Sequence, residues 1–524
     1  MEKIMRRASL LGLITLLATA LLLPGLTAAR SDRTATLERW AADTWAGFVA
    51  MTNPQTGLPS DNIGGELDPA TRSHYTSPTN IAMYIWATIA ARDLQIITPS
   101  EARARIAVTL DSIGAMERHE PSGQFWNWYD PDTLQKLTVW PEPPNNPVTP
   151  FASSVDNGWL ASALLMVANG AVPQLREPAG ALLDSMNFGC YYDPNANQIR
   201  GGFWLTPQGG SVAGDYCGMG EQVQYTGHHY GAFNTEPRIA SYIGMAMGDI
   251  PARHYFGGWR TFPDTCDWGW PETKPIGDWV TYTVEGEDLR VFEGAYPYDD
   301  QLVVPTWGGS SFEAFMVPLV VPEEEWGTAS WGVTHPLYAE SMIEYGLEEA
   351  QYGYWGFSPA SNPAGGYREY GIDYIGMEPI GYTSDSSVNN LDTKGLTRVD
   401  PGWDDPNCYR APDPIEEYGE GIVTPHAAAI ALDFAPDAAF ANLVNLEEDF
   451  VGLYGPGGFK DSVNVATGQV ADRYLSLDQG MFMAAVANEL RNDRLQHYFS
   501  HGAVEKALRP LMEMEQFGAG RIAQ

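Results

Sequence analysis

Two kinds of apolar segment alternate along the chain. The first kind is amphipathic: within residues 101–117, Ile106, Leu110 and Ile113 share one stripe, and the charged residues fall elsewhere. Apolar residues spaced three and four apart predict helices with one face in water. The same spacing predicts further helices in the ranges 37–51, 175–186, 338–345 and 440–446.

The second kind is apolar nearly all round and has polar residues at its N-terminal end. A helix that is apolar on every side is buried on every side. Six such segments begin at Thr76, Ser153, Asn234, Ser310, Thr424 and Ser476. Alternation with the amphipathic helices predicts an all-α fold, an (α/α)6 barrel of six inner and six outer helices. A bundle or a solenoid is the alternative, but a solenoid would show repeats at a fixed period, and none is visible.

In such a barrel the polar N-terminal ends of the inner helices open at one end, together with the long loops. The loop region 264–307 contains the alternating run DWVTYTVEGEDLRVFEG, which predicts a small β-hairpin that turns near Glu285 and Gly286. We place this hairpin over the active-site end. The polar stretch 383–422 is interpreted as an insertion over the same mouth. No linker divides residues 30–524, so we expect a single domain.

The N-terminus predicts export. Lys3, Arg6 and Arg7 precede an apolar run, and small residues follow through Ala29. We expect residues 1–29 to be a signal peptide and the protein to be secreted or periplasmic, without membrane contact after cleavage. Thr27 fits the cleavage pattern less well than alanine, so an uncleaved membrane anchor is the alternative.

The cysteines would meet an oxidising compartment. Cys190, Cys217, Cys266 and Cys408 allow three pairings, and Cys190 with Cys217 is the nearest pair in sequence. No Cys/His metal spacing is present, so we expect no metal and no cofactor. We also expect a monomer.

The charge balance limits the partners. The chain has 66 Asp and Glu residues against 30 Lys and Arg residues, so its field repels phosphate backbones, and we expect no nucleic acid partner. A neutral glycan is indifferent to that field. The 17 Trp and 26 Tyr residues are a large supply of rings that stack on sugars.

The stretch 352–382 is dense in aromatic residues and glycine and has no helical spacing. Glycine at this density predicts a loop whose backbone can approach a ligand closely, and Tyr and Trp supply flat faces with polar edges. This composition is typical of a carbohydrate site. A rigid surface loop held by its own aromatics is the alternative.

Four carboxylates stand at the beginnings of the apolar segments: Asp156, Glu236, Glu313 and Asp478. In a barrel they would face one cavity, roofed by the aromatic loop that carries Glu369. Glycoside hydrolysis needs one protonated and one ionised carboxyl, so this convergence predicts a glycosidase. The serine-hydrolase, zinc-protease, P-loop and dinucleotide-binding motifs are absent from the sequence.

Each carboxylate also has a structural interpretation. Asp156 and Asp478 fit as N-caps, and Ser310 with Glu313 matches a capping box, which is the stronger interpretation for Glu313. Glu236 precedes Pro237, and both the helix dipole and Arg238 favour its ionised form. As a proton donor it would need burial or a neighbouring carboxylate to outweigh them. His426, alone on an apolar helix, is more typical of a core residue.

Several strings resemble one known family, the glycoamylase-like domain of bacterial β-1,2-glucanases. They are YWGFSPASNPAGGYREYG, VTPHAAAIALDFAP, GLYGPGGFKDSVN and RYLSLDQGMFMAAVANEL. The resemblance runs from about Trp40 to the C-terminal helix and implies an (α/α)6 barrel. It also implies endo-acting, exo-acting sophorose-releasing, or transglycosylating relatives. The stretch 383–422 departs from the family pattern, which leaves endo and exo action open.

The resemblance implies inversion with Glu236 as general acid. Asp156 and Glu369 are the leading candidates for the base, followed by Asp478. The side chains expected to contact the glycan are Arg238, Trp159, Tyr230, Trp307, Glu313, Trp355, Tyr367, Arg368, Tyr370, His426 and Asp478. The alternative functions are a glucoamylase-type hydrolase of α-glucans and a glycan-binding protein without catalysis.

Overall fold

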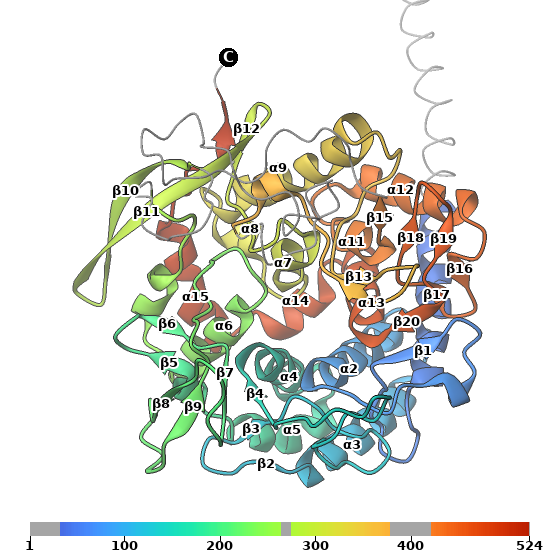
Figure 1. Cartoon of the computed structure of the whole chain (residues 1–524), viewed down its shortest axis with the longest axis horizontal. Helices are drawn as coiled ribbons and strands as arrows, with labels where there is room; N and C mark the ends of the chain where they lie inside the picture. Colours follow the sequence, from blue (N-terminus) through green and yellow to red (C-terminus); the bar gives the residue numbers. More distant parts are fainter. Residues whose placement is uncertain (1–31, 264–273, 378–420, 523–524) are drawn as a thin grey trace, which may run out of the picture.

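The computed structural model describes residues 32–263, 274–377 and 421–522, and helices are its main elements (Figure 1). The predicted signal peptide, Cys266, Cys408 and nearly all of the predicted insertion lie outside these described residues.

Six helices follow one another round the middle of the molecule (Figure 1). They are α2 (Pro78–Asp93), α4 (Ser154–Met166), α6 (Arg238–Met247), α7 (Ser311–Phe315), α11 (Pro425–Ala429) and α13 (Ser476–Arg491). Helix α13 packs on α2, α2 on α4, α4 on α6, α7 on α11, and α11 on α13. The side chain of Arg238 links α6 to α7 by hydrogen bonds to backbone carbonyls. These are the six segments that the sequence predicts as inner helices.

The predicted burial of these helices is confirmed. Ile81, Leu164, Ile243 and Met483 are each at most 1% exposed. Contact between α4 and α6 depends on Gly158, because a Cβ atom there would lie 3.0 Å from the Cα atom of Ala240. An absent side chain therefore lets two apolar helices pack backbone to backbone.

Two inner helices are shorter than the apolar pattern predicts. Helix α7 ends at Phe315, and the 3-10 turn η6 (Val317–Leu319) continues the chain. Pro318 explains this end, because proline has no backbone N–H to donate and its ring clashes with the preceding turn. Helix α11 also has a single turn and a half, followed by turns up to residue 434.

The amphipathic pattern predicts five of the remaining helices, which are the helix over 32–51, α3, α5, α9 and α12 in the full set that follows. The full set is a helix over 32–51, α3 (Pro99–Ala115), α5 (Arg176–Leu183), α8 (Glu323–Trp326), α9 (Trp331–Glu344), α12 (Pro436–Asp449), α14 (Arg494–Phe499) and α15 (Ala503–Met514). In α3 the predicted stripe of Ile106, Leu110 and Ile113 is buried. Among the described residues, no single helix is long and apolar enough to cross a membrane. One bent pair of helices, 154–171 with 173–191, is long and apolar enough when the two are taken together, by length and composition only.

The prediction of an all-α fold is incomplete, because small antiparallel sheets fill the loops between helices. The predicted hairpin is confirmed as β10 (Ile276–Val284) and β11 (Glu287–Tyr298), with Glu285 and Gly286 both at positive φ in its turn. Strands β12 (Gln301–Val303) and β21 (Gly520–Arg521) extend it to four strands. None of these strands lines the two large cavities described below.

The remaining strands are short. One sheet has the order β4 (Ala152–Ser153), β7 (Gly202–Trp204), β9 (Val223–Tyr225) and β8 (Val212–Gly214), and another has β15 (Ile422–Val423), β18 (Val463–Asn464) and β19 (Gln469–Val470). The two-stranded pairs are β1 (Asn62–Gly64) with β20 (Arg473–Leu475), β2 (Arg118–His119) with β3 (Gln124–Phe125), β5 (Tyr192–Asp193) with β6 (Gln198–Ile199), β13 (Ala360–Ser361) with β14 (Tyr367–Arg368), and β16 (Tyr454–Gly455) with β17 (Gly458–Phe459).

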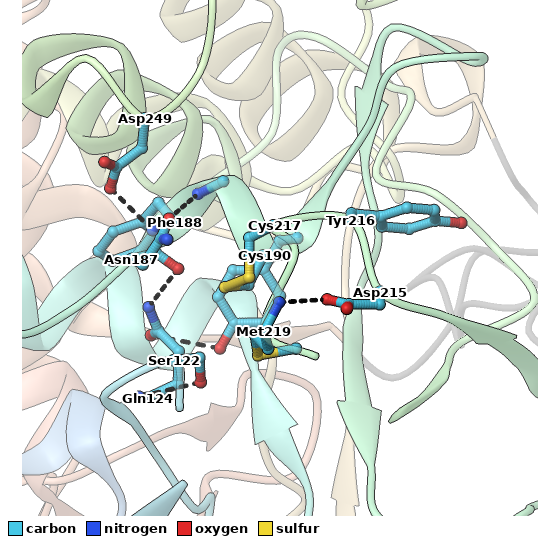
Figure 2. The surroundings of a disulfide bond; sticks show 12 residues. Ser122, Gln124, Asn187, Phe188, Cys190, Asp215, Tyr216, Cys217, Met219 and Asp249 are labelled. Atoms are coloured by element: carbon cyan, nitrogen blue, oxygen red, sulfur yellow. Dashed lines mark hydrogen bonds between the residues drawn. A yellow bond between two sulfur atoms is a disulfide. The ribbon is translucent and has the colours of Figure 1, made fainter. Parts of the chain in front are cut away.

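The predicted disulfide between Cys190 and Cys217 is present (Figure 2). Cys190 lies in the 3-10 turn η4 (Phe188–Tyr191), and Cys217 lies in the loop between β8 and β9. The backbone N–H of Phe188 donates to Asp249, which fixes η4 against the end of α6. The bond therefore ties a long loop to the helical core.

A buried ion pair ties the C-terminal segment to the hairpin. The guanidinium of Arg260 is fully buried and donates to Glu515 with a 2.8 Å hydrogen bond from Nε, and it lies 3.6 Å from Glu293 of β11. The hydroxyl of Tyr255 donates to the same Glu515 at 2.6 Å. One cation therefore serves two carboxylates that come from distant parts of the chain.

Replacing this cation should destabilise the fold. We expect Arg260→Met to lower the free energy of unfolding by about 3–5 kcal/mol, because it leaves buried carboxylates without a counter-charge. Urea denaturation measures this change. Arg509→Met is the matched control, since Arg509 pairs with Glu505 and Glu513 on the exposed face of α15 and should be nearly neutral. Equal urea midpoints and equal slopes of the unfolding free energy against urea concentration for the two variants would contradict the role of Arg260.

Candidate active site

Two cavities of about 540 and 550 Å³ meet at Glu236. Glu236, Phe312, Tyr367 and Leu477 line both. Trp307 lines only the first cavity, and Asp156 lines only the second. We call the two together the cleft, and each has the size of a small-molecule site.

The walls of the cleft are the N-terminal ends of the inner helices. Thr79 comes from α2, Asp156 from α4, Glu313 from α7 and Leu477 from α13, and Glu236 stands two residues before α6. The prediction that these ends open at one place is confirmed for five of the six helices. Helix α11 contributes no lining residue within the described part of the chain.

Two contacts from neighbouring inner helices fix Glu236. The indole N–H of Trp159 in α4 donates to the Oε2 atom of Glu236 at 2.6 Å. The backbone N–H of Glu236 donates to the Oε2 atom of Glu313 at 2.8 Å. The first contact orients the carboxyl of Glu236, and the second places a carboxylate directly beside it.

The surroundings of Glu236 favour its protonated form. Burial raises its pKa most, and the negative charges of Glu313 and Asp156 raise it further, whereas the Trp159 hydrogen bond and the charge of Arg238 lower it. The net result is a pKa well above the usual glutamate range. Burial and a neighbouring carboxylate are the two causes that the sequence argument requires if Glu236 is to donate a proton.

Glu313 is more than the helix cap that the sequence favours. Ser310 does cap α7, since its Oγ atom accepts from the N–H of Glu313 at 3.4 Å. The carboxylate of Glu313, however, reaches across to the backbone of Glu236 and lines the first cavity. Glu313 therefore lines the candidate site, in addition to its place in the capped first turn of α7.

Asp156 is not the N-cap of α4. The cap is Ser153, whose Oγ atom accepts from the N–H of Asp156 at 3.3 Å. The carboxylate of Asp156 instead accepts a 2.6 Å hydrogen bond from the hydroxyl of Thr79 and lines the second cavity. Burial raises its pKa. Glu369 lines the first cavity, so the two leading base candidates line different cavities.

Arg238 does not line the cleft, contrary to our expectation. All of its side-chain nitrogens have protein partners: Glu323, the carbonyls of Thr235 and Glu313, and the carbonyl of Ala314. It is 4% exposed. Its role is to hold α6 against α7, because no donor remains for a substrate.

Four other expected contacts lie away from the cleft lining. Trp159 and Trp355 are at most 1% exposed; Trp159 supports Glu236, and the backbone of Trp355 bonds to the side chain of Asn442. Tyr370 is buried and accepts a hydrogen bond from Asn362. Arg368 is exposed in β14 and is not among the lining residues. Aromatic density in a loop therefore marks core residues as well as site residues.

Three of the expected aromatic side chains do line the first cavity: Tyr230, Trp307 and Tyr367. Tyr367 also lines the second cavity, and it is 52% exposed. We interpret Tyr367 as the central aromatic surface of the cleft.

The second cavity has an aromatic cluster that the sequence argument missed. Tyr75, Trp128 and Trp140 lie together, with ring centroids 4.4 Å apart for Tyr75 and Trp140 and 5.3 Å apart for Trp128 and Trp140. The run FWNWYD at residues 125–130 was the available signal. Such rings offer stacking surfaces for sugars.

Asp478 and His426 lie behind the cleft wall. Asp478 is not an N-cap, because α13 begins at Ser476 and has no side-chain cap. His426 is 4% exposed and its Nε2 atom bonds to the hydroxyl of Ser358 at 2.8 Å. Neither residue lines the cleft, so neither is placed to contact a glycan directly.

Comparison with protein families gives two matches. Residues 347–503 match the Glycoamylase family, described as "Putative glucoamylase". This part of the chain is glycoamylase-like. Residues 39–189 match a family described as "Protein of unknown function (DUF3131)".

Two curated proteins resemble parts of the chain. The cyclic β-(1,2)-glucan synthase NdvB of Rhizobium meliloti (strain 1021) is 27% identical over 293 residues, which are 54% of this chain and 8% of the synthase. The exo β-1,2-glucooligosaccharide sophorohydrolase (non-reducing end) of Parabacteroides distasonis is 26% identical over 125 residues, which are 24% of this chain and 17% of that protein. The chain thus matches only a small part of either protein.

Among solved structures, an endo-β-1,2-glucanase from Chitinophaga pinensis in complex with sophorotriose and glucose is similar. The TM-score is 0.59 at 14% identity, over 91% of this chain and 98% of the glucanase. At this identity the likeness shows a shared fold. The glycoamylase-like match therefore sits within a fold that extends over nearly the whole chain.

The electrostatic account of Glu236 can be tested without an activity assay. We expect Glu313→Gln to lower the pKa of Glu236, because the neighbouring negative charge is removed while a side-chain oxygen remains to accept from the Glu236 N–H. Trp159→Phe should raise that pKa, because a donor to the ionised form is lost. A pH titration of the ¹³C-labelled glutamate carboxyls, assigned with Glu236→Gln, measures both. An unchanged pKa in Glu313→Gln would contradict the account.

Proposed function

We propose that this chain is a glycoside hydrolase that cleaves β-1,2-glucan, with Glu236 as the general acid. The observation that carries the proposal is the position of Glu236 where two cavities meet, with a half-buried carboxyl held by Trp159 beside Glu313. A glycan that extends through both cavities passes this carboxyl. A general acid must stand at such a point to protonate the oxygen of the bond that breaks.

The mechanism that we propose is inversion. Glu236 donates its proton to the glycosidic oxygen, while a second carboxylate takes a proton from the water that attacks the anomeric carbon. Asp156 and Glu369 are the candidates for this base, and each lines one of the two cavities. Because they line different cavities, the identity of the base also decides which cavity holds the attacking water.

The linkage of the substrate is supported by the similar proteins. A cyclic β-(1,2)-glucan synthase, a β-1,2-glucooligosaccharide hydrolase and an endo-β-1,2-glucanase all have β-1,2-glucan chemistry in their names. The size of the cleft and its aromatic lining are typical of a site that binds a glycan.

We further propose that the six buried helices close into an (α/α)6 barrel and that residues 30–524 form one domain. The succession of helix contacts round the middle of the molecule supports this. Export with a signal peptide over residues 1–29 is also proposed, and the disulfide between Cys190 and Cys217 is typical of an oxidising compartment.

A second candidate is a glucoamylase-type hydrolase of α-glucans, favoured by the description of the matched family. Incubation with linear β-1,2-glucan and, separately, with soluble starch distinguishes the two. We expect oligosaccharide release from β-1,2-glucan only. Release from starch alone would overturn the choice of substrate, and tight binding without release would indicate a glycan-binding protein.

A side chain at position 236 that cannot donate a proton should greatly slow turnover. We expect Glu236→Gln to lower kcat by roughly a hundred- to ten-thousand-fold, because the amide keeps the shape of the side chain but cannot act as an acid. Binding of β-1,2-glucan, measured by calorimetry, should remain. The control is Glu340→Gln. Glu340 lies on α9 and forms an exposed ion pair with Arg521, so this variant should retain full activity. Normal turnover by folded Glu236→Gln would refute the assignment.

The base can be assigned by a matched pair of variants. We expect one of Asp156→Asn and Glu369→Gln to lose activity as severely as Glu236→Gln, and the other to keep most of it, since a single general base is required. Added azide should rescue only the variant that lacks the base. Comparable, modest losses in both variants would show that neither carboxylate is the base.

A further inference from the structure

Three side chains from separate segments converge behind the cleft wall. They are His426 of α11, Asp461 after β17 and Asp478 of α13, and one ligand atom from each lies within 4.8 Å of the others. All three residues are at most 4% exposed. We call them the His-Asp-Asp cluster.

Each member of the cluster has a polar atom that no hydrogen bond satisfies within the described residues. These atoms are Nδ1 of His426, Oδ1 of Asp461 and Oδ2 of Asp478. Buried polar atoms nearly always have a partner, because leaving water without one is costly. Three such atoms in one place therefore indicate a missing common partner.

The spacing of the cluster fits an ion better than a direct hydrogen bond. Nδ1 of His426 lies 3.6 Å from Oδ2 of Asp478, which is too long for a hydrogen bond. Two ligands that are each ~2.1 Å from one ion at a tetrahedral angle are ~3.4 Å apart. The observed separation is close to that value.

Outer contacts orient the ligands. The Nε2 atom of His426 bonds to the hydroxyl of Ser358 at 2.8 Å, which leaves Nδ1 turned to the cluster. The Oδ2 atom of Asp461 accepts from the backbone N–H of Ser361 at 2.8 Å, which leaves Oδ1. Metal-binding histidines and carboxylates are commonly held by such second contacts.

We propose that His426, Asp461 and Asp478 bind a divalent transition-metal ion such as Zn²⁺. One imidazole nitrogen and two carboxylate oxygens are ligands typical of zinc, whereas calcium takes six to eight oxygens. The charge of the ion would also offset two carboxylates that are buried without an ion pair to lysine or arginine among the described residues.

The ion would hold the aromatic loop to the inner helices. Ser358 and Ser361 belong to that loop, and His426 and Asp478 belong to α11 and α13. Leu477, beside Asp478, lines both cavities of the cleft. The role is structural, so the proposal does not rest on the proposed glucanase activity.

The competing state has no ion. In that state one carboxyl keeps its proton and donates it to the other, since burial and the charge of Asp461 raise the pKa of Asp478 well above its usual value. The two states differ in metal content, which is measurable directly.

The test is metal analysis of the full chain, purified without a histidine tag and dialysed into metal-free buffer. We expect about one ion per chain by plasma mass spectrometry. A chelator should lower the thermal midpoint of the wild type, and ZnCl₂ should restore it. His426→Ala and Asp478→Asn should lose both the ion and the response to chelator.

His254→Ala is the matched control. His254 is equally buried, but both of its ring nitrogens already have partners, the carbonyl of Asn197 and the hydroxyl of Ser241. This variant should keep the ion and the response. A wild-type chain without bound metal, whose midpoint moves with neither chelator, ZnCl₂ nor MnCl₂, would overturn the proposal even if the cluster variants failed to fold.

Discussion

The arrangement of the site depends on the buried guanidinium of Arg238. Its five N–H donors are used by the carboxylate of Glu323 and by three carbonyls, two of them on α7, and it lies 4.9 Å from the ring centroid of Trp331. A buried cation needs a paired charge and complete hydrogen bonding to be tolerated. Meeting that need fixes α6 against α7, and the same junction places Glu236 beside Glu313.

The chemistry of Glu236 follows from that junction. The helix ends and Arg238 favour an ionised carboxylate, whereas burial and Glu313 favour the acid. Burial is the largest of these influences on the pKa, and the charge of the second carboxylate adds to it. Trp159 then orients a carboxyl that keeps its proton, which is the state that protonation of a leaving oxygen requires.

Local pattern was sufficient for the helices. Apolar segments with polar N-terminal ends predicted all six inner helices, and alternation with a turn predicted the hairpin at Glu285 and Gly286. The shortened α7 was also foreseeable from Pro318. The short sheets were not, because strands of two or three residues carry too little alternation to be recognised.

The site was predicted in part. Glu236, Asp156 and Glu369 line the cleft as expected, because the ends of buried helices meet at one place. The orientation of single side chains could not be predicted. Arg238 lies two residues after Glu236 in the sequence, yet its side chain is buried in the core. The His-Asp-Asp cluster also escaped, since its members are far apart in sequence and have no metal-ligand spacing.

The central claim is that a glycan passes through both cavities with its cleaved bond at Glu236. The most direct test is a crystal structure of the Glu236→Gln variant with a β-1,2-linked oligosaccharide. The account predicts sugar units in both cavities and one glycosidic oxygen within ~2.6–3.2 Å of the amide of residue 236. An oligosaccharide confined to one cavity, with every glycosidic oxygen out of reach of that amide, would contradict it.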